Sequence, residues 1–329
     1  MSKSPIRTLS AGERSVASMT DLLQRVRATG LLPRGGPVVV LLSGGRDSVC
    51  LLDCALRLAG QDSVVALHVN YGLRPEADVD EAHCRALCEH LGAALKVERV
   101  ERPGETGNMQ AWARAVRLGA GTRLAAGRGA AVATGHTASA QAETVLYRLA
   151  ASPGRRALLG MAPRDGVLVR PVLGATREET AAHCAARGLP WREDASNADP
   201  AFARTRVREG LLPALRAVHP AAEVSVVRTA ALLREESEVL DQLVAEVLET
   251  PGDAIALDRL AALPRALGRL VLRRLAEDAT RGLCPRAAGR LDEVLALRDG
   301  GALDLGEGAR AVVDAGVLRI DRTPPRWTG

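Results

Sequence analysis

The stretch PVVVLLSGGRDSVCLLDCALRLA, residues 37–59, decides the fold of this chain. Its apolar run from Pro37 to Leu42 predicts a strand, and the apolar-periodic residues from about Ser48 predict a helix. Between them, Gly44 and Gly45 let a ligand approach the backbone closely. The helix N-terminus that follows offers unpaired N–H groups and a positive dipole end. This arrangement predicts a phosphate-binding loop.

An ordinary strand-to-helix turn with a Ser or Asp cap is the plain alternative, and a lone Gly-Gly pair would favour it. A Walker-type loop needs a Lys after its second glycine, and a Rossmann loop needs G-x-G-x-x-G. Neither pattern is present here. The form SGGxDS instead resembles the pyrophosphate loop of the N-type ATP pyrophosphatases, which cleave ATP to AMP and pyrophosphate through an adenylated intermediate.

Length and composition indicate a globular protein with a large and a smaller domain. The chain has 329 residues, of which 47% are hydrophobic and 25% charged, enough to bury a substantial core. No uncharged apolar run reaches the roughly eighteen residues of a membrane span, and residues 1–20 lack a signal-peptide core. We therefore expect a cytoplasmic protein whose cysteines remain thiols.

Two cysteine pairs, Cys50/Cys54 and Cys84/Cys88, are each spaced four residues apart. On helices this spacing places both thiols of a pair on one face, which could suit a metal. No second pair of ligands has the spacing of a zinc site, however. Buried core positions are the favoured interpretation.

The charge balance permits nucleic-acid binding without establishing it. The net charge is +5, from 44 basic and 39 acidic residues, and the isoelectric point is near 9.1. Aromatic residues make up 2% of the chain, which leaves few platforms for stacking single-stranded bases. Shape and phosphate contacts would therefore dominate any RNA recognition.

Strand-like and helix-like stretches alternate through the first part of the chain, which predicts an α/β fold with a doubly wound, mostly parallel sheet. The strand-like runs are Val38–Leu42, Val64–Asn70, Ala94–Val100 and Ala130–Thr134. The helix-like stretches are Ala17–Thr29, Ser48–Ala59, Val79–Leu91, Met109–Ala126 and Ala140–Ala150. Ligands bind at the carboxyl ends of such strands, so the phosphate loop, residues 68–70 and residues 134–136 are expected at one site.

A second, mainly helical domain is expected from about Ala221. A long amphipathic pattern runs through Glu249, breaks at Pro251-Gly252 and is followed by two more helical stretches. Short strands with turns then follow, at Ala302–Leu305, Arg310–Val313 and Val317–Ile320. We expect a catalytic domain at residues 1–220 and a substrate-binding domain at 221–329 that ends in hairpin-like strands.

Several segments, in order, resemble the tRNA(Ile)-lysidine synthetase family of the PP-loop superfamily. They are SGGRDS (43–48), HVNYGLR (68–74), AWARAVR (111–117), TGHTASAQAET (134–144), LLGM (158–161), RPVL (170–173), EDASN (193–197) and FARTRVREGLLPAL (202–215). The resemblance implies an adenine nucleotide alpha hydrolase-like fold. It also implies an ATP- and Mg²⁺-dependent ligase that attaches free lysine to the wobble cytidine of tRNA(Ile) with a CAU anticodon, through an adenylated cytidine. The sequence sets no oligomeric state and is compatible with a homodimer.

The resemblance also assigns roles to residues. ATP would be held by Ser43, Gly44, Gly45, Arg46, Asp47 and Ser48. Asp47 would also hold the metal, although a helix cap is its plain alternative. The catalytic set would be Asp47, Arg114, His136 and Glu143, with Arg117 on the same helical face as Arg114. Arg204, Arg206 and Arg208 would contact tRNA phosphates, unless they form a solvated surface or pair with nearby acids.

The chain departs from the family pattern HHxxDQxET at three positions. Thr137 replaces the second His, and Ser139 and Ala140 stand where two acids are usual. Either Asp47 and Glu143 suffice for the metal, or the protein is a degenerate relative that binds tRNA or nucleotide without turnover. We favour an active enzyme.

Another PP-loop enzyme is the third alternative, and the sequence argues against it. Iron–sulfur thiolation enzymes use CxxC pairs, which this sequence lacks. An amidotransferase would need a glutaminase domain, for which no length remains.

Overall fold

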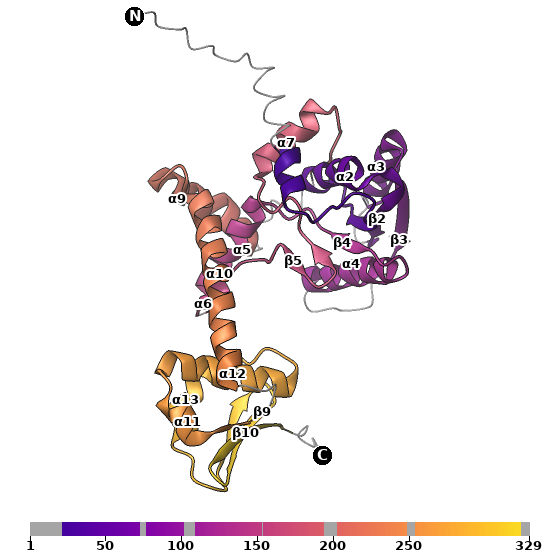
Figure 1. The fold of residues 1–329 in the computed structure, drawn as a ribbon. Coiled ribbons are helices and arrows are strands. Elements are labelled where there is room, and N and C mark those ends of the chain that lie inside the picture. Colours follow the sequence, from indigo (N-terminus) through magenta and orange to yellow (C-terminus); the bar gives the residue numbers. More distant parts are fainter. Residues whose placement is uncertain are drawn as a thin grey trace, which may run out of the picture. The chain divides into compact units, whose positions relative to one another are not determined.

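The computed structural model describes residues 22–72, 77–101, 109–152, 154–193, 203–248 and 254–323. The chain divides into two compact units, residues 1–233 and 234–329, each with a sheet of its own (Figure 1). The division falls inside the long helix α10 (Ala222–Leu248), which corresponds to the predicted amphipathic stretch from Ala221 to Glu249. The assignment of residues 1–220 and 221–329 to a catalytic and a substrate-binding domain stays a prediction.

A six-stranded sheet in the order β3-β2-β1-β4-β6-β5 forms the centre of the first unit. All its neighbouring strands are parallel except β5, which runs antiparallel to β6. The strands are β1 (Val38–Leu41), β2 (Val64–Asn70), β3 (Ala94–Arg99), β4 (Ala131–Ala133), β5 (Arg164–Asp165) and β6 (Leu168–Val169). The predicted α/β fold is confirmed, and β1 to β4 match the predicted strands to within one residue at each end.

Strand β1 explains why both faces of this sheet are covered. Its four residues are all buried, as in the parallel sheets of α/β proteins. Val38 and Val40 join the core made with helices α2 (Arg46–Ala59), α3 (Ala77–Leu91) and α7 (Arg177–Ala186). Val39 and Leu41 join the core on the other face, made with α4 (Met109–Ala126). Figure 1 shows α2 and α3 on one side of the sheet and α4 on the other.

The remaining helices of this unit follow the strand–helix alternation less closely. Residues 22–28 are helical, which matches the described part of the predicted stretch Ala17–Thr29. The others are η1 (Gln61–Ser63), α5 (Ala138–Ala151), α6 (Arg155–Leu158), α8 (Ala203–Arg206), the π-helical segment η3 (Val207–Leu211) and α9 (Leu212–Val218). No helix of the described residues is long and apolar enough to cross a membrane.

The connection order places a topological switch point at β1. The chain moves from β1 to β2 and β3 on one side, and β4 then pairs with β1 on its other side. The loops after β1 and β4 diverge at such a point and leave a crevice at the carboxyl ends of the strands. The predicted phosphate loop follows β1 and therefore lies at this crevice.

The second unit contains a four-stranded antiparallel sheet in the order β7-β10-β9-β8. Leu272 and Leu275 of helix α12 pack with Leu318 and Ile320 of the sheet in a single core. The elements are β7 (Ala254–Ala256), α11 (Leu257–Ala262), α12 (Arg265–Thr280), η4 (Ala287–Arg290), α13 (Leu291–Leu295), β8 (Ala302–Gly306), β9 (Ala309–Asp314) and β10 (Val317–Arg322). The three predicted tail strands are confirmed to within two residues, whereas β7 was not predicted.

Candidate active site

The loop between β1 and α2 is held by its own serines. Ser48 Oγ donates a hydrogen bond to the Gly45 carbonyl at 2.8 Å, accepts one from Ser43 N at 3.2 Å and lies 3.1 Å from Ser43 Oγ. Gly45 is the N-cap residue of α2 and provides no side-chain cap. The first turn of α2 therefore has no side-chain acceptor of its own at the N-cap, as an anion-binding helix N-terminus requires.

Two glycines permit close approaches around this loop. Gly44 has φ +83°, and a Cβ there would lie 3.1 Å from His83 Cδ2 and 3.2 Å from Cys84 Sγ. After β4, a Cβ on Gly135 would lie 2.9 Å from the backbone carbonyl carbon of Asp47. Only glycine fits this second contact, which brings the end of β4 against the first turn of α2.

The end of β2 contacts the same loop from its other side. His68 Nδ1 lies 2.9 Å from the Leu42 carbonyl and 3.4 Å from Cys84 Sγ. Asn70 donates hydrogen bonds to Asp78 and to the buried Glu81, both at 3.0 Å. Residues 68–70 and 134–136 therefore both lie beside the phosphate loop, as the parallel sheet predicts.

Asp47 directs its carboxylate towards α7. Thr180 Oγ1 donates a hydrogen bond of 2.5 Å to Asp47 Oδ1, and Arg177 Nε lies 3.8 Å from Asp47 Oδ2. Burial is the largest influence on this carboxyl and raises its pKa, against the lowering effects of Thr180, Arg177 and Arg46. A desolvated carboxylate of this kind would be stabilised by a further cation.

Glu143 is buried and bound by two arginines. Arg208 is bidentate to it, with Nε 2.7 Å from Oε1 and Nη2 3.1 Å from Oε2. Arg177 Nη1 lies 3.1 Å from Glu143 Oε1, so one guanidinium connects Glu143 to Asp47. Arg208 lies on the π-helical segment η3, and such segments are frequent at functional sites.

His136 lies among four arginines, Arg114, Arg117, Arg170 and Arg204, which we call the arginine cluster. Its Nδ1 is 2.7 Å from Thr134 Oγ1. Burial first, and then the charges of the arginine cluster, lower the pKa of His136 to about 3. Burial and repulsion from Arg204, Arg117, Arg170 and Arg148 also lower the pKa of Arg114. His136 is therefore neutral at pH 7, and the cluster favours the binding of a polyanion.

The structure thus brings most of the predicted site residues into two connected groups. The loop residues, Asp47 and Glu143 form one group, and Arg114, His136 and Arg204 form the other. Arg206 is exposed on α8. Three residues of these groups were missed as site residues. Arg177 and Thr180 contact Asp47, and the charge of Arg170 acts on His136. Arg170 opens the quoted segment RPVL, and Thr176-x-x-Glu179 forms a capping box. Residues 73–74, 194–197 and 202 of the quoted segments lie outside the described residues.

Two of the three departures from the family pattern, Thr137 and Ser139, form local hydrogen bonds with their side chains. Thr137 is the N-cap of α5 and accepts a hydrogen bond from Ala140 N at 3.4 Å. Ser139 is buried and accepts one from Arg177 N at 3.2 Å. Ser139 therefore holds the start of α7, which supplies Arg177 to Asp47 and Glu143.

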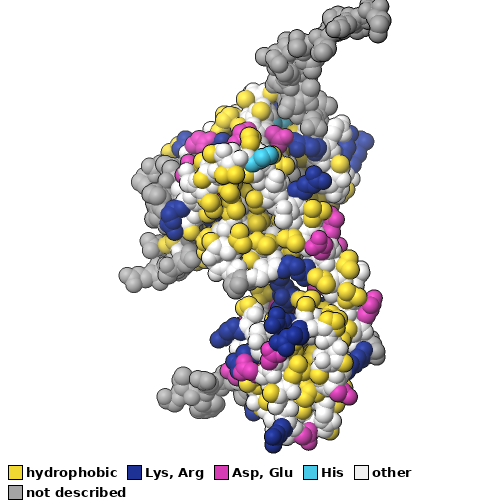
Figure 2. Space-filling model, turned by 90° about the vertical axis from the view of Figure 1, so that its left-hand side faces the viewer, with side chains coloured by type: hydrophobic (Ala, Val, Ile, Leu, Met, Phe, Trp, Pro, Cys, Tyr) yellow, Lys and Arg dark blue, Asp and Glu magenta, His cyan; other side chains and the backbone are white. Residues whose placement is uncertain are grey.

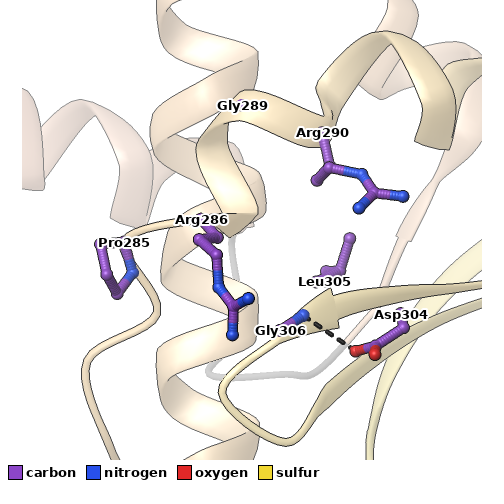
Figure 3. A pocket seen from close by; sticks show the side chains of 7 residues that line it. All are labelled: Pro285, Arg286, Gly289, Arg290, Asp304, Leu305 and Gly306. Atoms are coloured by element: carbon purple, nitrogen blue, oxygen red, sulfur yellow. Dashed lines mark hydrogen bonds between the residues drawn. The ribbon is translucent and has the colours of Figure 1, made fainter.

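The second unit has a pocket of its own, of about 360 Å³ (Figure 3). The pocket is lined by Pro285, Arg286, Gly289, Arg290, Asp304, Leu305 and Gly306. Arg286 pairs with Glu307 at 2.6 Å and Arg290 pairs with Glu293 at 2.6 Å, so both guanidinium groups have carboxylate partners. None of the predicted site residues lines this pocket.

The surface is mixed in charge. Figure 2 shows Lys and Arg side chains interspersed with Asp and Glu on both units, on the face in view. A modest net charge of +5 fits this pattern. The positive charge that could bind an anion is therefore concentrated at the arginine cluster.

Comparisons with known proteins agree with this geometry. A family model described as the PP-loop domain matches residues 18–215. A tRNA(Ile)-lysidine synthase of Thermus thermophilus is 42% identical over 274 residues, 80% of this chain and 52% of the relative. One of Salinispora tropica is 39% identical over 309 residues, covering 87% of this chain and 91% of the relative. The chain thus spans about half the length of the Thermus relative and most of the Salinispora one.

A solved structure shares the fold over part of this chain. It is a U34-tRNA thiolase, NcsA, from Methanococcus maripaludis, with a TM-score of 0.57 and 18% sequence identity. The match covers 67% of this chain and 80% of the thiolase chain.

Proposed function

We propose, because the chain belongs to the tRNA(Ile)-lysidine synthase family of PP-loop proteins, that it ligates lysine to the wobble cytidine of tRNA(Ile) with a CAU anticodon. ATP would adenylate the cytidine and release pyrophosphate, and the lysine amine would then displace AMP. The observation that carries this proposal is the junction of the phosphate loop with Asp47, Arg177 and Glu143 beside the arginine cluster. The substrates are cellular, so the proposed activity belongs in the cytoplasm.

ATP phosphates would bind the loop backbone of Ser43 to Ser48. The first turn of α2 supplies N–H donors, and Arg46 supplies a cation that pairs with Glu193 at 3.4 Å in this structure. Ser43 and Ser48 would keep the loop in shape through their mutual contacts. This arrangement holds the β- and γ-phosphates while leaving the α-phosphate open to the cytidine oxygen.

Asp47 fits a magnesium ion better than Glu143 does. The Asp47 carboxylate is partly buried, and its contacts among the described residues are the Thr180 hydroxyl and the Arg177 guanidinium at 3.8 Å. Glu143 already accepts from two guanidinium groups, so a metal would have to displace one of them. When bound, Mg²⁺ would neutralise charge on the departing pyrophosphate.

The arginine cluster would stabilise charge on the reacting phosphate. Arg114 is the family's catalytic arginine by resemblance, and its pKa is lowered by burial and by neighbouring cations, a cost that a bound anion would relieve. His136 would be neutral before substrate binds and would act through hydrogen bonds. Incoming phosphate charge would raise its pKa and prepare it to hold a proton.

The tRNA would contact the exposed Arg204 and Arg206 of α8 and continue onto the second unit. Arg208 binds Glu143 and would have to release it to reach a phosphate. If Arg208 stays bound, it would position Glu143 instead of contacting the tRNA. Both predicted domains would then take part, residues 1–220 in catalysis and residues 221–329 in holding tRNA. A homodimer is compatible with this arrangement, and sedimentation of the full chain measures it.

The test is lysine-dependent release of AMP and pyrophosphate from ATP with a tRNA(Ile) transcript. A transcript whose wobble cytidine is replaced by uridine is the matched control, and Asp47→Ala is the enzyme blank. Turnover that needs lysine and the cytidine supports the ligase. Turnover without lysine would indicate another adenylating enzyme.

The second candidate function is binding of tRNA or nucleotide without catalysis, because Ser139 and Ala140 stand where the family usually has acids. Tight tRNA binding without turnover in the same assay would favour it. In that case Ala140→Asp should restore measurable ligation, whereas an active wild-type protein would remove this candidate.

A further inference from the structure

A cluster of thiols and a histidine joins α2 to α7 behind the phosphate loop. The Sγ atoms of Cys50 and Cys54 and a ring nitrogen of His183 all lie within 4.8 Å of one another, and all three residues are buried. The Cys184 thiol lies within hydrogen-bonding reach of the Cys50 thiol. Two thiols and one imidazole thus meet in the core, with a third thiol beside Cys50, and the described cysteines are free of disulfides.

One ring nitrogen of His183 is hydrogen-bonded, and the other has no hydrogen-bond partner among the described residues. Its Nε2 lies 2.8 Å from Asp53 Oδ2, and Asp53 Oδ1 accepts from Arg187 at 3.3 Å. The Asp53 carboxylate accepts a hydrogen bond from Nε2–H of His183, which leaves the lone pair on Nδ1. This Nδ1 is buried and has no hydrogen-bond partner among the described residues.

A buried, unpartnered nitrogen beside three thiols is unusual for a plain core. Polar atoms of this kind are nearly always hydrogen-bonded or bound to a metal. A histidine that ligates a metal through one nitrogen commonly donates its other N–H to a carboxylate, as His183 does to Asp53. Sulfur ligands with a single imidazole are a frequent donor set for zinc.

We propose that this cluster binds one zinc ion through Cys50, Cys54, Cys184 and His183 Nδ1. A tetrahedral zinc with Zn–S of about 2.3 Å and Zn–N of about 2.0–2.1 Å places its ligand atoms roughly 3.5–3.8 Å apart. The ligand atoms of Cys50, Cys54 and His183, up to 4.8 Å apart, close to this value with side-chain shifts of about 1 Å. The Cys184 thiol would turn from the Arg46 carbonyl towards the ion. Four protein ligands leave no open position, so the ion is structural and takes no part in the reaction.

The ion would connect the two helices that build the phosphate site. Helix α2 starts with Arg46 and Asp47, and α7 contributes Arg177 and Thr180 to Asp47. Cys184 Sγ donates to the Arg46 carbonyl at 3.5 Å, a hydrogen bond that ligation of zinc by the thiolate would replace. Zinc would fix the position of α7 along α2 and so hold Arg177 and Thr180 on Asp47.

Metal content of the full-length protein, purified from zinc-supplemented medium and dialysed against a weak chelator, tests the proposal. We expect one zinc ion per chain, measured by inductively coupled plasma mass spectrometry. Cobalt exchanged into the protein should give the intense visible bands and the thiolate charge-transfer band of a tetrahedral site. A folded wild-type chain with no bound zinc and no such cobalt spectrum would overturn the proposal, whatever the variants do.

Matched variants locate the site. Cys54→Ala should lose the bound zinc, whereas Cys88→Ala should keep it, although Cys88 is also a buried helical cysteine with a partner four residues away. Asp53→Asn should lower zinc affinity about 10–100-fold, the usual effect of removing a carboxylate behind a ligating histidine. Zinc retained by folded Cys54→Ala, or lost equally from Cys88→Ala, would contradict the assignment.

Discussion

At the scale of single residues, Arg177 connects several parts of the proposed site. Its guanidinium lies between Asp47 and Glu143, two of the proposed catalytic carboxylates, while its backbone N–H donates to Ser139. Sequence patterns could not assign this residue, because its role comes from the packing of α7 on α2. The phosphate loop could be predicted, since its glycines, serines and helix start are contiguous in the chain.

We predict that Arg177→Met lowers kcat/KM for ligation about 10–100-fold, equivalent to roughly 1.4–2.7 kcal/mol. Loss of the bridge removes the Arg177 ion pair from both Asp47 and Glu143, which keeps Arg208. Steady-state ligation with the tRNA(Ile) transcript measures the effect. Arg123→Met removes an exposed ion pair with Glu98 and serves as control, with an expected change in unfolding free energy within about 0.5 kcal/mol.

Protonation of His136 should make the free energy of unfolding depend on pH between about 3 and about 6.5. Its pKa is about 3 in the folded protein and about 6.5 when unfolded, so between these values only the unfolded state binds the proton. The free energy of unfolding should therefore fall as pH drops from about 6.5 towards 3, by up to about 1.4 kcal/mol per pH unit from this residue.

Urea denaturation at pH 7 and pH 5 measures this dependence. His136→Gln should lose less stability between the two pH values than the wild type does. Equal losses in both proteins would show that His136 is not held neutral by the arginine cluster. Added pyrophosphate should also reduce the wild-type loss, since bound anion charge raises the folded-state pKa.

At the scale of elements, the β1–α2 and β4–α5 junctions are joined at one glycine. We predict that Gly135→Ala weakens ATP binding, because its Cβ would lie 2.9 Å from the Asp47 backbone and push α2 away from β4. Overpacking of this kind costs about 1–3 kcal/mol. Gly127→Ala, where the nearest atom would be 4.0 Å away, is the matched control. Calorimetric titration with ATP should separate the two variants, and equal affinities would argue against the close approach.

Element prediction succeeded where periodic patterns were long. The strands β1 to β4 and the helices α2 to α5 were predictable because apolar periodicity and turn residues define them. Strands β5, β6 and β7 have only two or three residues each, too few for a period to show. Helix α7 has a capping box formed by Thr176 and Glu179, a local signal that was overlooked.

At the scale of the whole molecule, the proposed substrate is a polyanion that meets a modestly basic protein. We predict that tRNA affinity falls as salt rises, and that the double variant Arg204→Ala/Arg206→Ala reduces the slope of log affinity against log salt by about 1.4–1.8. This follows if each arginine contacts one phosphate. Filter binding over a range of salt concentrations measures the slope, with Arg123→Ala as control. An unchanged slope would remove both residues from the tRNA surface.

The arginine cluster also bears on how the proposed reaction ends. Cations that attract the triphosphate attract the released pyrophosphate as well, and Ser139 and Ala140 supply no acid to repel it. Attraction shared by substrate and product lowers KM without speeding the chemical step. Departure of the leaving group, rather than bond making, would then limit turnover, and added pyrophosphate would inhibit the enzyme.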